Sequence, residues 1–167
     1  MSGEFVRYPD RSELNQEIKI VDGEIRSFHH PKKGALITRE YFWKKLGLAG
    51  NKESQEFREA ISLLVKYHSE PTYFNYEKNK EKLVIKLSLN SKLTKYYSNK
   101  LLILLAISDV KGRLSEDTDE KLEIIKEFEN LSIELDCYDK AFNFIDEYSK
   151  IRYLASDNIW HSQKIYD

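Results

Sequence analysis

Hydrophobic and polar residues alternate in residues 17–28, EIKIVDGEIRSF, and this is the clearest local pattern in the chain. Ile18 and Ile20 lie on one side of an extended segment, and Ile25 follows after the dipeptide Asp22-Gly23. Asp-Gly suits a type I′ turn because glycine adopts positive φ without steric cost. The pattern therefore predicts a two-stranded hairpin, which we expect a loop over residues 29–34 to follow.

The spacing of apolar residues then changes to three and four, which is typical of amphipathic helices. Residues 38–46 predict a short helix, with Thr38 as its N-cap and Gly47 at its end. Residues 54–68 predict a second helix, which Pro71 ends. The apolar stripe of this second helix is Phe57, Ala60, Ile61, Leu64, Val65 and His68.

Alternation returns in residues 73–89, where TYFNY and LVIKLSL flank the polar stretch EKNKEK. This pattern predicts a second hairpin. The residues that would share one face of its second strand are Leu83, Ile85, Leu87 and Leu89. Helix, helix and hairpin in this order resemble a winged helix-turn-helix in element order alone.

From Ser91 onward the pattern is helical throughout, with three helices expected. The first includes the apolar run LLILLAI, and the second starts after a Ser115 N-cap and buries Leu122, Ile125, Phe128 and Leu131. The third follows an Asp136 N-cap and carries Ala141, Phe142, Ile145, Tyr148 and Ile151 in phase. The expected fold class is α+β: an N-terminal hairpin, a winged-helix-like helix-helix-hairpin unit and a C-terminal three-helix segment.

Charge divides the chain into two parts. Residues 1–100 carry 19 Lys+Arg against 13 Asp+Glu, whereas residues 101–167 carry 8 against 15. We expect a basic part over residues 1–90 and an acidic helical part over residues 91–167, either as two units or packed as one domain. Such asymmetry is typical of proteins with an acidic or nucleic-acid partner, although neutral proteins also segregate charge by chance. Opposite charges on the two parts also permit self-association.

Composition limits the class of protein. With 41% hydrophobic and 33% charged residues the chain is globular rather than disordered. A single cysteine, Cys137, excludes an intramolecular disulfide and favours a reducing compartment; we interpret it as a small buried hydrophobe. The first residues lack the apolar core of a signal peptide, and LLILLAI is far shorter than the roughly 20 residues that span a bilayer. We expect a cytoplasmic protein without a membrane partner.

The acidic stretch 108–120, SDVKGRLSEDTDE, raises the question of a metal loop. A calcium loop that began at Asp109 would need oxygen ligands at its third and fifth positions, where Lys111 and Arg113 stand. The stretch is better interpreted as a joint between helices, in which Gly112 ends one helix and Ser115 begins the next.

The same stretch resembles the helical core of TerB-like (tellurite-resistance type) domains, over about residues 99–150. The matching positions are Asp109, Gly112, Leu114, Ser115 and residues 116–120. The sequence departs from that family because Val110-Lys111 separates Asp109 from Gly112, so any metal-related property of the family is not carried over. The resemblance implies a helical scaffold module of stress or defence systems without a catalytic centre.

No motif with a catalytic role is present in the sequence. It contains neither Gly-x-Ser-x-Gly, nor a Walker pattern, nor Gly-x-Gly-x-x-Gly, and its histidines lack zinc-ligand spacing. We therefore expect no catalytic residue, no metal and no cofactor. An enzyme whose site is assembled from distant residues is the least favoured alternative.

Nucleic acid is the partner that a winged helix would bind, through base contacts from its second helix and phosphate contacts from basic side chains. The candidate residues for this role are Lys32, Lys33, Arg39, Lys44, Lys45, Arg58, Lys78, Lys80 and Lys82. Against it, the second helix carries Glu53, Glu56 and Glu59, which phosphates would repel.

The favoured hypothesis is a non-enzymatic interaction, adaptor or regulatory protein with a protein partner. Large aromatic side chains dominate interface energetics, and Tyr73, Tyr76 and Trp160 are the candidate anchors. For Phe74, between the two tyrosines, we expect core packing instead. The alternative function is a winged-helix regulator that binds DNA or RNA.

Overall fold

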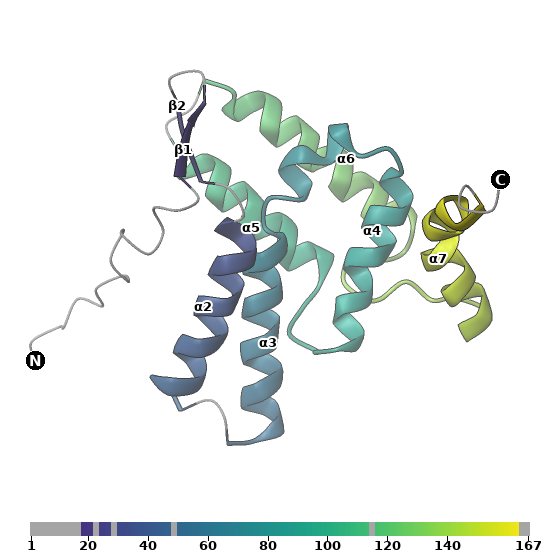
Figure 1. Cartoon of the computed structure of the whole chain (residues 1–167), viewed down its shortest axis with the longest axis horizontal. Helices are drawn as coiled ribbons and strands as arrows, with labels where there is room; N and C mark the ends of the chain where they lie inside the picture. Colours follow the sequence, from purple (N-terminus) through teal and green to yellow (C-terminus); the bar gives the residue numbers. More distant parts are fainter. Residues whose placement is uncertain (1–17, 22–23, 28–29, 48–49, 114–115, 164–167) are drawn as a thin grey trace, which may run out of the picture.

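The computed structural model describes residues 18–21, 24–27, 30–47, 50–113 and 116–163, and the side chains among them within residues 30–155. Helices make up nearly all of this part of the chain (Figure 1). The fold is therefore mainly α-helical, and the predicted α+β class is wrong. The one sheet in the described residues is a two-stranded ribbon before the first described helix.

That ribbon lies at the position of the predicted N-terminal hairpin. Strand β1 (Ile18–Val21) pairs antiparallel with β2 (Glu24–Ser27), with Ile20 opposite Ile25. The predicted turn residues, Asp22 and Gly23, lie outside the described residues. The ribbon pairs with no other described strand.

Two long helices follow as an antiparallel pair, α2 (His30–Lys44) and α3 (Lys52–Tyr67), side by side in Figure 1. The predicted loop over residues 29–34 is wrong from His30 on, because Pro31 occupies the first turn of α2, where its missing N–H costs nothing. Thr38 accordingly lies inside α2 and does not cap it. The connection after α2 includes Gly47 with φ +64°.

Small residues set the distance between α2 and α3. The Ser62 hydroxyl donates to the carbonyl oxygen of buried Ala35 at 2.9 Å. A Cβ on Gly34 would stand 3.0 Å from Cγ1 of Val65. At the start of α3 the Asn51 side chain accepts from the Ser54 N–H at 2.8 Å, so Asn51 is a true N-cap.

The second predicted hairpin, residues 73–89, is wrong, and with it the winged-helix arrangement. The chain instead forms a 3₁₀ helix η1 (Pro71–Tyr76), the helix α4 (Lys80–Ser88) and a second 3₁₀ helix η2 (Leu89–Lys92). Asn79 caps α4 by accepting from the Lys82 N–H at 2.9 Å.

The apolar residues of α4 explain the error. Leu83, Ile85 and Leu87 alternate as in a strand, but Val84 between them is also apolar and is fully buried. Val84, Leu87 and Ser88, at spacings of three and four, face the core as one helical side. A short apolar run fits both the two-residue period of a strand and the 3.6-residue period of a helix. Here Asn79, which caps the first turn of α4, favours the helix.

The helices α5 (Asn99–Lys111) and α6 (Thr118–Glu134) confirm the first two C-terminal helices. Ser98 caps α5 by accepting from the Leu101 N–H. The expected cap Ser115 and the matching residue Leu114 lie outside the described residues, and α6 begins after Asp117. Of the predicted core positions of α6, Ile125 and Phe128 are buried, while Leu122 and Leu131 pack partly buried against the core.

Asp136 does not cap a third helix but ends α6. Its φ is 52°, its N–H bonds the carbonyl of Ile133, and the Cys137 N–H bonds that of Ser132, which is a Schellman C-cap. Residues 137–146 are not helical. The last helix, α7 (Glu147–Gln163), starts where Asp146 accepts from the Ser149 N–H at 2.6 Å.

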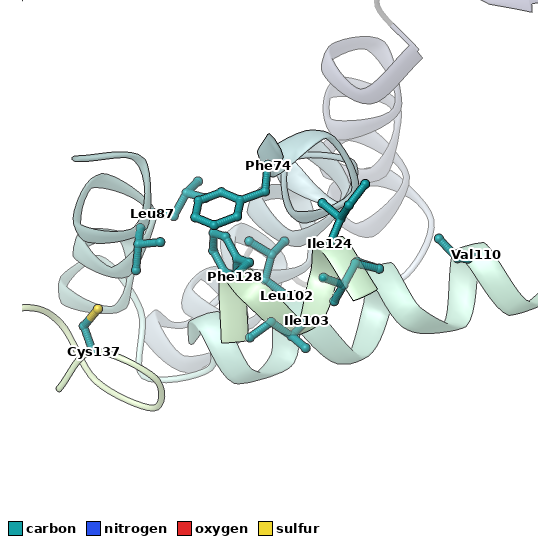
Figure 2. Close-up of a cluster of buried hydrophobic side chains, with 11 residues drawn as sticks. Phe74, Leu87, Leu102, Ile103, Val110, Ile124, Phe128 and Cys137 are labelled. Carbon is teal, nitrogen blue, oxygen red and sulfur yellow. The ribbon is translucent and has the colours of Figure 1, made fainter. Parts of the chain in front are cut away.

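One hydrophobic core joins residues from both sides of residue 90 (Figure 2). Phe74 of η1 meets Phe128 of α6 edge to face with ring centroids 5.1 Å apart, and Leu102 of α5 is buried beside them. Phe74 thus has the core role expected of it. None of the described helices combines the length and apolar character that a bilayer crossing requires.

Candidate functional site

The η1 helix presents both predicted partner-binding tyrosines side by side. Tyr73 is 55% exposed and Tyr76 is 77% exposed, and their ring centroids are 6.5 Å apart. Both rings stand outward because the residues between and before them point inward: Pro71, Thr72 and Phe74 are buried.

The backbone of η1 is held in place at both ends. The Thr72 N–H bonds the carbonyl of Ser69 at 3.1 Å, and the Glu77 N–H bonds that of Phe74 at 3.2 Å. Since Phe74 is locked against Phe128 in the core, the two tyrosines sit on a rigid base.

A small pocket of about 30 Å³ opens beside Tyr73. Four elements meet there: the start of α2, η1, the end of α5 and the start of α6. Its lining residues are His30, Ser69, Thr72, Tyr73, Asp109, Val110, Arg113, Asp117 and Lys121. We call this pocket, together with Tyr73 and Tyr76, the η1 surface.

Charges in the pocket are balanced by one ion pair at the end of α5 and one at the start of α6. The Arg113 guanidinium pairs with Asp109, and the Lys121 ammonium lies 2.5 Å from Asp117; both pairs are four residues apart. At the α2 side the His30 ring contacts that of His68 with centroids 5.4 Å apart, and Nδ1 of His68 lies 2.7 Å from the Val65 carbonyl oxygen. The pocket thus offers hydrogen-bonding groups without a large excess of charge.

Glu70, just before η1, has a pKa raised above its ordinary value. Burial disfavours the carboxylate, and the charge of Glu77 adds to the effect, while Lys86 and Lys32 oppose it.

The candidate nucleic-acid residues do not assemble on one element. Arg39 donates to Glu59 at 3.0 Å, and the buried Arg58 lies between Glu59, at 3.1 Å, and the Trp43 ring, 4.6 Å from its centroid. Burial favours the neutral form of Glu59, but the two guanidiniums outweigh it and lower its pKa. Both arginines are thus engaged in the α2–α3 contact.

The lysines of this set divide between two regions. Lys32, Lys33, Lys44 and Lys45 lie on or just after α2, and Lys44 pairs with Glu40. Lys78 is exposed before α4; Lys80 binds Glu127 at 3.0 Å; and Lys82 is 8% exposed, with its ammonium 6.0 Å from the Tyr153 ring. The predicted wing does not exist, so these last three lie on and before a helix.

The acids of α3 also find cationic partners. Glu53 accepts from Lys95 at 3.3 Å and from the Tyr96 hydroxyl at 2.5 Å, and Glu56 lies 3.9 Å from Lys52. These pairs reduce the repulsion of phosphate that the sequence suggested for α3.

Of the remaining candidates, Cys137 is buried, and burial raises its pKa to about 11, so it is a neutral thiol at neutral pH. Trp160 belongs to α7, but its side chain lies outside the described ones. No group of three or more His, Cys, Asp or Glu side chains is placed to hold a metal ion within the described residues.

The pocket was missed by sequence reasoning because its parts are far apart along the chain. Tyr73 is separated from Arg113 by forty positions, and no short motif links them. Comparison with known proteins adds nothing here: no family model, curated protein or solved structure matches the chain. Function is therefore inferred from the contacts, burial and charges of the described residues alone.

Proposed function

We propose that the protein is a non-enzymatic interaction protein that binds a protein partner through the η1 surface. The observation that carries this proposal is the pair of exposed tyrosines, Tyr73 and Tyr76, on a 3₁₀ turn anchored in the core by Phe74. Tyrosine is enriched at interface hot spots because it supplies a large contact area with few rotatable bonds.

Rigidity of the base favours binding. An anchor that is already in place when the partner arrives loses little conformational entropy, whereas ordering a free side chain costs roughly 0.5–1.5 kcal/mol. Pro71, Thr72 and Phe74 are buried under the tyrosines, so folding already fixes the backbone from which the two rings project.

The pocket beside Tyr73 indicates which part of a partner fits. A volume of about 30 Å³ admits a small polar group rather than an aromatic ring. Arg113 and Asp109 on one wall, and Lys121 and Asp117 on another, offer both donors and acceptors. The fitting partner is a loop or extended segment that covers the tyrosines and places one short polar side chain in the pocket.

Affinity capture from cells that naturally produce the protein tests this function. The wild-type chain should retain at least one protein that the double variant Tyr73→Ala/Tyr76→Ala loses, because each anchor truncated at a hot spot costs about 2 kcal/mol or more. Leu93→Ala is the matched control, since Leu93 is also large, apolar and exposed (68%) but lies outside the η1 surface. The control should retain the same protein.

Two results would contradict the proposal. One is a set of captured proteins that the tyrosine substitutions leave unchanged. The other is captured material that is lost on nuclease treatment. That result would identify nucleic acid as the partner and indicate the lysines of α2 and α4 as its contacts.

A further inference from the structure

Lys82 of α4 is only 8% exposed, although its side chain carries a charge. Lysine is rarely buried to this extent unless other groups take the place of water around its ammonium. Lys86, four residues further along the same helix, is exposed. Residues four apart lie on the same side of a helix, so one lysine of this side of α4 is covered and the other is not.

The helix that lies over Lys82 is α7. The Tyr153 ring of α7 lies 6.0 Å from the Lys82 ammonium, at the outer limit of a cation–π contact. Tyr153 also contacts Phe144, with ring centroids 5.7 Å apart, and Phe144 contacts Phe142 at 4.9 Å. Figure 1 shows α7 at one end of the molecule, next to α4. Aromatic contacts thus connect the segment before α7 with the lysine that α7 covers.

The segment before α7 is fixed to the core, but α7 itself is held by few contacts. The Phe142 N–H donates to the buried Ser88 hydroxyl at 3.0 Å, and the Phe142 ring packs against the core. Beyond it, Ile145 is 97% exposed, Tyr148 73% and Ile151 63%. Within the described residues, no helix packs along α7. An element with so few buried contacts opens at a free energy far below that of global unfolding.

We propose that α7 is a hinged cover that controls access to Lys82. In the closed position, which the structure shows, Tyr153 lies over the lysine. In the open position α7 turns about residues 145–146, just before the helix, while the segment before them stays bound to the core. Opening brings Lys82 into solvent beside Lys86, so this side of α4 then presents two lysines instead of one.

Acylation of lysines in the full chain, followed by mass spectrometry, tests whether α7 covers Lys82. The rate at each lysine is compared with its rate in the same chain unfolded in urea. In the wild type, folding should slow the reaction of Lys82 by about tenfold or more and that of Lys86 very little. Tyr153→Ala should restore most of the rate at Lys82, because the covering ring is removed. Tyr148→Ala, the same exchange at a 73% exposed position of α7, is the matched control and should leave Lys82 protected.

Hydrogen exchange of the wild type tests whether α7 opens as a unit. A detached α7 is a single helix of 17 residues, and isolated helices of this length are marginal in water. Its amides should therefore exchange together, about tenfold or more faster than those of α5. Tyr153→Ala should accelerate exchange in α7 and leave the amides of α5 as protected as in the wild type, which also shows that the variant folds.

Several results would overturn the proposal. A wild-type Lys82 that reacts as fast as in the unfolded chain would show that nothing covers it. Protection of Lys82 that Tyr153→Ala leaves unchanged, or that Tyr148→Ala removes equally, would show that Tyr153 does not hold the cover closed. Equal protection of α7 and α5, or loss of α5 protection in Tyr153→Ala, would show that α7 belongs to the cooperative core. None of the substituted residues lies on the η1 surface, so these outcomes are independent of the proposed function.

Discussion

At the scale of single residues, most polar side chains in the interior have a structural role. Ser62 ties α3 to α2, Ser88 ties the segment before α7 to α4, and the Thr94 hydroxyl donates to the Glu56 carbonyl at 2.8 Å. Each of these hydroxyls joins two segments far apart in sequence. Glu70 is different, because its environment disfavours its charge.

Glu70→Gln should stabilise the protein at neutral pH. The pKa of Glu70 in the folded state is above its ordinary value of 4.5, mainly through burial and then through Glu77. The stability associated with the protonated form is therefore present below 4.5 and lost as pH rises through the raised pKa. We expect a gain of less than about 1 kcal/mol at pH 7, since the side chain is partly solvated.

Urea titrations at pH 7 and at about pH 4.5 measure this difference. The gain should shrink at the lower pH, where Glu70 itself becomes neutral. Glu123→Gln, at an exposed position within α6, is the matched control for the exchange of the side chain itself. An equal gain at both pH values would mean that packing, not charge, separates Gln from Glu at position 70.

At the scale of elements, a helix could be predicted from the sequence where the helical spacing of apolar residues extends over a long segment. The helices α3, α5 and α6 follow from their three- and four-residue spacing, and the β1–β2 ribbon follows from alternation around Asp22-Gly23. The cap at Asn51 acts as its residue type suggests, and Gly47 follows the end of α2 in the left-handed region.

Prediction failed where one residue type serves two purposes. Asp136 is a favourable N-cap residue, but aspartate also tolerates the left-handed conformation that ends α6. The apolar residues of LVIKLSL, residues 83–89, fit the period of a strand as well as that of a helix. Ile145, Tyr148 and Ile151 have helical spacing, yet they are exposed, because a pattern shows that a side is apolar without showing what covers it.

The candidate site was predictable only in part. Tyr73 and Tyr76 were predicted as large aromatic anchors in a hairpin; the hairpin does not form, but both side chains are exposed together on η1. The pocket could not be predicted, because it forms where the ends of α5 and α6 meet η1. Long-range contacts of this kind have no local signature.

The α2–α3 contact provides a prediction at this scale. Ala35 is 5% exposed and faces Ser62 across a close helix crossing, so Ala35→Leu should separate the helices and destabilise the protein by about 1–3 kcal/mol. Leu36→Ala, on the exposed side of α2, should change stability by less than about 0.5 kcal/mol. Chemical denaturation of both variants measures the difference. Equal effects would show that α2 does not pack on α3 through Ala35.

At the scale of the whole molecule, one hydrophobic core includes residues from both the basic part (1–90) and the acidic part (91–167) of the sequence. Leu87 of α4 and Leu102 of α5 belong to one buried cluster, which also includes Phe74 and Phe128. A core shared by both parts should make them unfold together.

Thermal or urea unfolding should therefore show one transition by both near- and far-ultraviolet circular dichroism. Leu87→Ala and Leu102→Ala, one on each side of residue 90, should each lower the stability of that same transition by about 2–5 kcal/mol. The exposed Leu93→Ala should leave it nearly unchanged. Two transitions, with Leu87→Ala affecting only one, would instead identify two independent units.

The central claim is that the rigid, exposed tyrosines of η1 contact a protein partner, and site-specific photo-crosslinking in cells tests it most directly. A photoreactive phenylalanine derivative at Tyr76 should give an adduct of discrete mass that contains a second protein, because this side chain is 77% exposed on an anchored turn. The same group at Leu93 should not give that adduct. No adduct from position 76, or the same products from both positions, would contradict the claim.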